Sequence, residues 1–478
     1  GFVVSDWGSI GELIQHGVAR DDRHAALLAI TAGSDMDMES GVYIDHLGDL
    51  VESGDISEEL VDEAVRRVLR VKFQLGLFDD PYRYSDPDRE QEIVSNPAHL
   101  EAARDVARKS IVLLKNDGDL LPLDKTEGTI AVIGPLAADK DSPLGSWRGR
   151  AIDGSAVSLL EGIEAAVADS VEVLYAEGAP LGVGERSFMQ ELEINYSDRS
   201  GFEAAVEAAR EADTVVIALG EEAFQSGEGR SQVDIALKGV QRELLQAVHA
   251  ANPRTVLVLM NGRPLTLIWE SQNIPSILET WHLGSAAGHA IADVLFGDYN
   301  PSGKLPVSFP YHVGQEPLYY NVKNTGRPGP SDMVFWSHYT DAPNEALFPF
   351  GHGLSYTSFA YSEPVLSATE ITMDEPLSIE ITVKNIGSRA GAEVVQLYVR
   401  DLVGSVTRPV KELKGFQKVH LEPEEARKLT FTLTADDLAF YTARERWEAE
   451  PGEFLVFVGT SSTAVKEAKF TLTGDESE

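Results

Sequence analysis

The sequence predicts a protein of several domains, with α/β structure as far as roughly residue 300 and a β-sandwich at the C-terminal end. Three observations lead to this fold class. The chain has 478 residues, which is too many for one ordinary hydrophobic core. Strand-like apolar runs alternate with helical patterns in its first part. After Tyr361, apolar and polar residues alternate with period two between turn signals, which is typical of a sandwich.

Residues 1–80 show a β-α-β-α pattern, the repeat of parallel α/β structure. The opening GFVVS is a continuous apolar run, so we expect a strand that is covered on both faces. Residues 21–33 follow with helical spacing and end on Gly33, a candidate C-cap. SDMDM is expected as a short strand. Ser57 is the expected N-cap of a second helix, whose apolar residues trace one face.

Four further segments complete the predicted domain organisation. Residues 81–105 begin with an excess of Asp, Pro and Arg and are predicted as a linker. Residues 106–312 contain strands such as TIAVIG and TVLVLM between helical stretches, which predicts an open parallel sheet sandwiched by helices. Residues 313–362 are rich in Pro, Gly and Tyr and are predicted as an irregular linker. Residues 363–478 are the expected β-sandwich.

The composition excludes several kinds of partner and chemistry. The formal net charge of −37, from 77 acidic and 40 basic residues, would repel a nucleic-acid backbone. No apolar run approaches the roughly 20 residues needed to span a bilayer, so we expect no membrane insertion. The absence of cysteine excludes disulfides, thiolate catalysis and cysteine-based zinc sites. A small neutral substrate remains compatible with the charge.

Familiar catalytic motifs are also missing from the sequence. It contains no HExxH or HxxEH pair, no GxSxG elbow and no GxxxxGK[ST] phosphate loop. The turn after TIAVIG reads GPLA and lacks the dinucleotide fingerprint. A nicotinamide-dependent oxidoreductase is therefore supported by the predicted fold class alone, and on that basis it is kept as an alternative.

Two carboxylate sites are candidates for chemistry. Asp6 follows the first predicted strand, at the edge where parallel α/β folds place their active sites, although a strand-end Asp often caps the next helix instead. Trp7 beside it is either a packing residue or a platform for a sugar ring. The loop after DTVVIALG offers Glu221, Glu222 and Glu228, the last between two glycines that suit a mobile loop; a solvated acidic loop is the alternative. Two carboxylates are the minimum machinery for glycoside hydrolysis.

The chain resembles glycoside hydrolase family 3, the β-glucosidase and β-xylosidase family. The resemblance covers essentially the whole chain, and its motifs occur in the family's order. They are GFVVSDWGS, AGSDMDM, AVRRVLRVKFQLGLFDDPY, SIVLLKN with LLPL, AVIGPLA, LGSW, SGEGR, VLMNGRPL, IADVLFGDYNPSGKLPVSFP and PFGHGLSYTSF.

The resemblance gives each predicted region a fold. Residues 1–80 are expected to be the C-terminal part of a (β/α)8 barrel. Residues 106–312 correspond to the family's α/β sandwich domain, and residues 363–478 to its fibronectin type III-like β-sandwich. The family's usual barrel has about six further βα units before SDW, with most of the residues that grip the terminal sugar. We therefore expect the N-terminal barrel half as a second chain or an unlisted segment.

The resemblance also implies roles for individual residues. Asp6 matches the family's nucleophile and Glu228 its general acid/base, while Trp7 is a candidate substrate-binding residue. The implied mechanism is double displacement with retention, with Asp6 ionised, Glu228 protonated and no metal or cofactor. The two residues are expected to face one pocket between the first two domains, with carboxyl groups roughly 5–5.5 Å apart. Ala286 stands where the family usually has Glu, so no binding role is assigned to that loop.

The favoured function is a retaining exo-β-glucosidase that releases glucose from β-glucosides or cello-oligosaccharides, as in cellulose degradation. The alternatives are a β-xylosidase or another β-glycosidase of the same family, and an inactive carbohydrate-binding fragment. The expected partner is a small saccharide, with homo-oligomerisation left open. A periplasmic or secreted location is favoured over a cytoplasmic one.

Overall fold

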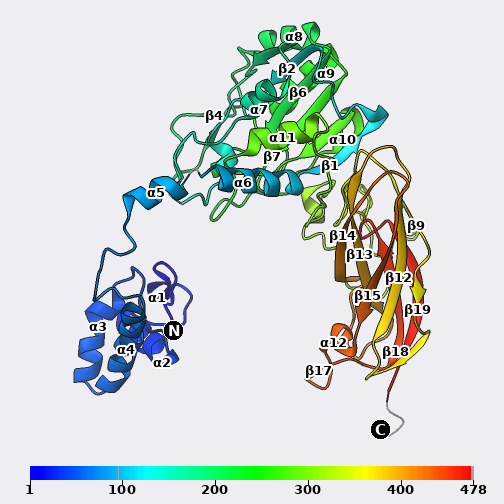
Figure 1. Cartoon of the computed structure of the whole chain (residues 1–478). Coiled ribbons are helices and arrows are strands. Elements are labelled where there is room, and N and C mark those ends of the chain that lie inside the picture. Colours follow the sequence, from blue (N-terminus) through cyan, green and yellow to red (C-terminus); the bar gives the residue numbers. More distant parts are fainter. Residues whose placement is uncertain (95, 150, 475–478) are drawn as a thin grey trace. The chain divides into compact units, whose positions relative to one another are not determined.

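The structure is a computed structural model that describes residues 1–94, 96–149 and 151–474. The chain forms two compact units, residues 1–96 and residues 97–478, which are described separately (Figure 1). Among the helices of the described ranges, none combines the length and apolar composition needed to cross a bilayer.

The first unit is mainly helical. Its helices are α1 (Ser9–Glu12), α2 (Asp22–Ala32), α3 (Val42–Glu52), α4 (Glu58–Gln74) and α5 (Pro87–Ile93). Both predicted caps are confirmed. Gly33 ends α2 in the left-handed region at φ 93°, and the Ser57 side chain accepts a hydrogen bond from the Leu60 N–H at the start of α4.

The expectation of a buried strand at residues 1–5 is wrong for this structure. One parallel bridge, between Val4 and Met36, is all the β-structure described for residues 1–5, and the side chains of Val3 and Val4 are 57% and 40% exposed. A strand becomes covered on both faces only when further strands and helices flank it. The apolar face of α4 is likewise open in part, since Ala64 is buried but Phe73 is exposed.

The second unit begins with a six-stranded sheet in the order β1-β8-β7-β6-β2-β3. Neighbouring strands are parallel except for β1 and β8, which are antiparallel. Because the sequence order reverses within the sheet, this is a doubly wound arrangement. The strands are β1 (Val112–Asn116), β2 (Gly128–Ile133), β3 (Val171–Ala176), β6 (Thr214–Gly220), β7 (Thr255–Met260) and β8 (Ser276–Glu279).

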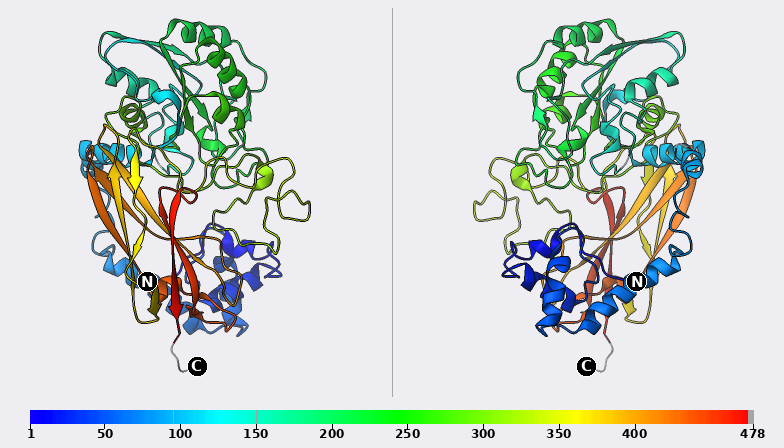
Figure 2. Two further views of the ribbon diagram at one scale, coloured as in Figure 1. Left: turned by 90° about the vertical axis from the view of Figure 1, so that its right-hand side faces the viewer. Right: turned by 90° about the vertical axis from the view of Figure 1, so that its left-hand side faces the viewer.

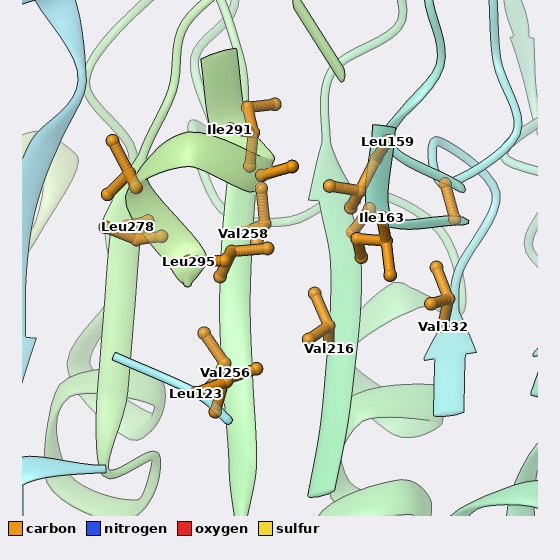
Figure 3. Close-up of a cluster of buried hydrophobic side chains, with 14 of the residues drawn as sticks. Leu123, Val132, Leu159, Ile163, Val216, Val256, Val258, Leu278, Ile291 and Leu295 are labelled. Carbon is orange, nitrogen blue, oxygen red and sulfur yellow. The ribbon is translucent and has the colours of Figure 1, made fainter. Parts of the chain in front are cut away.

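Helices cover both faces of this sheet and bury a separate core on each. On one face, α7 (Leu159–Ala166) and α11 (Ala287–Leu295) pack on outward-pointing valines of the sheet, as Figure 3 shows. On the other face, α8 (Phe202–Glu211) and α9 (Gln241–Ala251) cover the alternate residues of the same strands. Two further helices are α6 (Pro97–Ser110), which packs on α11, and α10 (Ile268–Asn273). The predicted helix–sheet–helix fold is confirmed.

The C-terminal part is a β-sandwich of two mainly antiparallel sheets packed on one core (Figure 1, Figure 2). One sheet joins β9 (Phe359–Tyr361), β10 (Val365–Leu366), β12 (Leu377–Asn385) and β15 (Ala426–Leu433). The other has the order β11-β19-β18-β13-β14 and contains one parallel pair, β11 with β19. Its strands are β11 (Glu370–Thr372), β13 (Gly391–Asp401), β14 (Glu412–Leu421), β18 (Gly452–Gly459) and β19 (Val465–Thr473). The predicted sandwich is therefore also confirmed.

A buried lysine joins the α/β domain to the sandwich. The Lys304 ammonium donates to the carbonyl oxygen of Gly353 and the hydroxyl of Thr460, both at 2.8 Å, and lies 3.2 Å from the carboxylate of Glu393. Burial lowers the pKa of Lys304, while Glu393 acts in the opposite direction. The exact domain limits stay predictions; α6, for example, continues past the predicted linker end at residue 105.

The close approach of α7 and α11 should make Gly288 intolerant of a side chain. A Cβ there would overlap the carbonyl oxygen of Ser158, a backbone atom that cannot rotate away. We expect Gly288→Ala to cost about 1–3 kcal/mol, measured as a lower midpoint of thermal or urea unfolding. Gly314→Ala is the control, since nothing lies near its Cβ position, and should change stability by less than about 0.5 kcal/mol. Equal midpoints for the two variants would contradict the packing.

Candidate active site

Asp6 lies where the chain leaves its bridge with Met36. The backbone on either side is fixed by two hydrogen bonds, from Ser5 N–H to the Met36 carbonyl at 3.0 Å and from Gly8 N–H to the Met38 carbonyl at 2.8 Å. The Asp6 carboxylate accepts from the Trp7 N–H at 2.7 Å. Gly8, not Asp6, is the N-cap of α1, and no side chain caps that helix. The helix-cap alternative for Asp6 is therefore wrong, and its carboxylate is exposed next to Trp7, which is 68% exposed.

A second aspartate, Asp35, stabilises the backbone segment that precedes Asp6. The Asp35 side chain is almost fully buried, accepts a hydrogen bond from the Val3 N–H at 2.9 Å and lies 3.1 Å from the Arg67 guanidinium of α4. It thereby ties the bridge that precedes Asp6 to a helix. Sequence reasoning recognised SDMDM only as a strand, because neither partner of Asp35 is near it in the chain.

The three glutamates of the loop after β6 have different environments. Glu221 and Glu222 are buried, at 2% and 1% exposure, whereas Glu228 is exposed at the tip. The Glu221 carboxylate lies 2.8 Å from the Arg263 Nε and accepts from the Gly262 N–H at 3.1 Å. Sequence reasoning singled out Glu228 among the three, and the structure distinguishes it further as the exposed carboxylate beside two buried ones.

Glu222 belongs to a second arginine-centred cluster. Its carboxylate lies 2.8 Å from the Arg186 Nε and accepts from the Phe224 N–H at 2.7 Å. Another nitrogen of Arg186 donates to Asp139 at 2.7 Å, and Asp139 also accepts from the Ser142 hydroxyl. Burial raises the pKa of Glu222, with Arg186 acting against it. Burial has the largest effect on Asp139 as well, but the bonds from Arg186 and Ser142 together outweigh it and lower the pKa of Asp139.

A buried neutral acid lies at the end of the neighbouring strand β8. The Glu279 side chain is fully buried; its two oxygens accept from the Asn261 amide and the Trp281 N–H, both at 3.0 Å. Burial raises the pKa of Glu279 to about 8, and the two hydrogen bonds only partly oppose this. Glu221, Asn261 and Glu279 thus stand at the carboxyl ends of three adjacent parallel strands, β6, β7 and β8.

Aromatic side chains surround the base of the Glu228 loop. The ring of Phe188 lies edge-on to Trp147 and to Phe224, with centroids 5.6 and 6.3 Å apart. The Arg230 guanidinium lies over Phe188 at 5.2 Å. Trp147 is 67% exposed, which leaves an indole face beside the loop. Sequence reasoning used Trp147 only as part of the LGSW motif, because no local signal places it against this loop.

Two further features bear on ligand binding. A pocket of about 380 Å³ opens beside the loop, lined among others by Gly229, Arg230 and Lys238. Within the described ranges, no group of three or more His, Cys, Asp or Glu side chains is arranged to hold a metal ion.

Ala286, to which the sequence analysis assigned no binding role, is buried at the start of α11.

Asp6 belongs to the first unit and Glu228 to the second. The common pocket and the carboxyl separation expected from the sequence therefore stay predictions.

Comparisons with known proteins match the chain in three places. A model of the glycosyl hydrolase family 3 C-terminal domain matches residues 111–356, and a model of the family's N-terminal domain matches residues 1–71. A fibronectin type III-like domain matches residues 393–462. All three matches fall within this one chain, so they give no support to the predicted second chain.

Individual relatives agree with these matches. The chain is 43% identical to a periplasmic β-glucosidase of Salmonella typhimurium, over 99% of this chain and 63% of the relative. It is 38% identical to a β-xylosidase of Formosa agariphila, over 97% of this chain and 63% of that protein. A crystal structure of a β-glucosidase from Listeria innocua in complex with glucose superposes with a TM-score of 0.89 at 39% identity, covering 99% of this chain and 63% of that one. The chain thus spans somewhat less than two thirds of each of these three proteins.

The raised pKa of Glu279 predicts a specific pH dependence of stability. The folded protein holds this proton up to about pH 8, whereas the unfolded chain releases it near the ordinary value of 4.5. Between these values the folded state binds more protons, so Glu279 makes stability fall as the pH rises. Glu279→Gln mimics the neutral acid and should lack this fall. We expect its stability relative to wild type to increase from pH 5 to pH 8 by at least about 1.4 kcal/mol, the equivalent of one pKa unit.

The measurement is the unfolding midpoint of both proteins across that pH range. Glu185→Gln, which removes an exposed carboxylate of the same domain, is the control and should show no such trend. A constant difference between Glu279→Gln and wild type would contradict the assignment of a neutral acid.

Proposed function

The chain belongs to glycosyl hydrolase family 3, and from this membership we propose that the protein carrying it is an exo-acting β-glucosidase. It releases terminal glucose from β-glucosides or cello-oligosaccharides. The observation that carries the proposal is the contrast within one loop, where two carboxylates are buried against arginines and Glu228 is left at the surface. The β-glucosidases among the similar proteins support the choice of sugar.

The proposed mechanism is double displacement with retention of configuration. The Asp6 carboxylate attacks the anomeric carbon while Glu228 protonates the departing oxygen; Glu228 then takes a proton from the water that releases the sugar. The exposed Trp7 indole offers an apolar face for a sugar ring. None of these steps calls for a metal ion or a cofactor, and the proposal includes neither.

A β-xylosidase is the second candidate, and the β-xylosidase relative of Formosa agariphila favours it. The ratio of kcat/KM for aryl β-glucosides and aryl β-xylosides decides between the two. A non-catalytic carbohydrate-binding protein is the remaining alternative, and it would bind such compounds without turnover. We further propose a periplasmic or secreted location, supported by the periplasmic relative of Salmonella typhimurium.

Asp6→Asn should abolish turnover by the natural protein that carries this chain. The amide cannot form the glycosyl–enzyme bond, so kcat for an aryl β-glucoside is expected to fall at least about 10³-fold. Asp22→Asn, an exposed first-turn residue of α2 in the same unit, is the control and should keep wild-type activity. Activity that survives Asp6→Asn would overturn the nucleophile assignment. Proton NMR of early products should show the β-anomer.

Glu228→Gln should impair the enzyme according to the leaving group. Phenyl β-glucoside needs protonation of its departing oxygen, so kcat/KM is expected to fall about 10²–10⁴-fold. 2,4-Dinitrophenolate departs without protonation, so kcat/KM for 2,4-dinitrophenyl β-glucoside should fall far less. Azide should restore turnover of the activated substrate by forming β-glucosyl azide, since the second step then needs no base. Equal losses on both substrates would argue against Glu228 as the acid/base.

A further inference from the structure

One guanidinium group joins the two ends of the Glu228 loop. The same terminal nitrogen of Arg263 donates to the carbonyl oxygens of Gln225 and Arg230, at 2.5 and 2.9 Å. Residues 226–229, which include Glu228, therefore form a bulge whose two ends share this donor, and the Gln232 side-chain amide adds a second link by donating to the Gln225 carbonyl at 3.1 Å. Arg263 comes from the loop after β7, so the contact fixes the bulge to the sheet.

Arg263 is itself fixed on its sheet side. Its Nε lies 2.8 Å from the buried Glu221 carboxylate, and its carbonyl oxygen accepts from the Asn261 amide at 2.8 Å. The same Asn261 amide donates to Glu279. Arg263 is therefore anchored at two points beside the sheet, by its guanidinium at Glu221 after β6 and by its backbone carbonyl at Asn261 after β7, while the guanidinium also contacts both ends of the bulge.

The bulge has little rigidity of its own. Gly227 and Gly229 occupy the left-handed region at φ 111° and 70°, and glycine leaves such a segment many alternative conformations. Packing restrains its first two residues: Ser226 is buried against Gly262 of the loop after β7, and a Cβ on Gly227 would overlap the Ser146 hydroxyl. Arg230 also donates to the carbonyl oxygens of Phe224, Glu228 and Phe188, so it links the loop to itself and to the segment around Phe188. Arg263 differs from it in that it comes from the loop after β7 and contacts both ends of the bulge.

We propose that Arg263 is a positioning residue, which holds the base of the bulge so that the Glu228 carboxyl group keeps the orientation needed to protonate the leaving group. This role rests on the proposed β-glucosidase function. The planar, multidentate guanidinium is essential to it, because a lysine ammonium is a point charge that cannot reach the Glu221 carboxylate and both loop carbonyls in the same geometry.

The test compares Arg263→Lys with wild type on two substrates, in the natural protein that carries this chain. Protonation matters for phenyl β-glucoside and hardly for 2,4-dinitrophenyl β-glucoside. A misplaced Glu228 should therefore lower kcat/KM for the phenyl substrate about 10- to 100-fold more than for the activated one. Amide hydrogen exchange of residues 226–230 should also become faster, which needs no activity to observe.

Arg242→Lys is the matched control. Arg242 also pairs with a buried glutamate, Glu270, at 2.8 Å, but it lies on α9 and does not touch the loop. It is expected to lower the unfolding midpoint without any preference between the two substrates. Equal losses of Arg263→Lys on both substrates, or unchanged exchange in residues 226–230, would overturn the inference. If Glu228→Gln itself shows no leaving-group dependence, the acid/base assignment fails as well, whereas dependence in Glu228→Gln alone overturns only the role of Arg263.

Discussion

The pairing of buried carboxylates with arginines at the carboxyl edge of the sheet is the interaction on which the rest of the candidate site depends. Glu221 and Glu222 give up nearly all their hydration, and a buried charge without a partner is strongly destabilising. Arg263 and Arg186 offset that cost only while both keep their positions. The loop after β6 is thus fixed over its first residues, which are buried as far as Ser226, and its exposed part begins at Gly227.

This arrangement divides the loop into a rigid base and an adaptable tip. The geometry of the base is set by the parallel strands, whose carboxyl ends bring Glu221, Asn261 and Glu279 together. The conformational freedom of the tip comes from Gly227 and Gly229, which lie in the left-handed region. The proposed general acid, Glu228, would have to reach different leaving groups yet return to one orientation, and a short tip on a fixed base meets both needs.

Local features could be predicted from the sequence and distant ones could not. The caps at Gly33 and Ser57 and strands such as TIAVIG and TVLVLM depend on neighbouring residues, and these were predicted correctly. The covering of Val3 and Val4 depends on the tertiary surroundings of that segment, and this prediction failed. In the same way, Asp6 looked like a helix cap because the left-handed turn at Gly8 cannot be read from its neighbours.

The candidate site divides along the same line. The motifs indicated Asp6 and Glu228, but nothing in the sequence showed that Glu221 and Glu222 are buried while Glu228 is exposed. That distinction depends on Arg263 and Arg186, which approach from other strands and loops. The residues proposed to contact the substrate could be recognised from sequence motifs, whereas the residues that hold them in place can be recognised only from contacts in the structure.

The buried Lys304 has a consequence for how this architecture can change in evolution. Its partners Glu393 and Thr460 belong to the sandwich, and Gly353 to the segment that leads there. A replacement domain that covered this lysine without supplying a carboxylate would leave the ammonium group buried and without its counter-ion. The C-terminal domain therefore cannot be exchanged independently of the α/β domain. Domain shuffling would have to replace Lys304 at the same time or supply a new carboxylate for it.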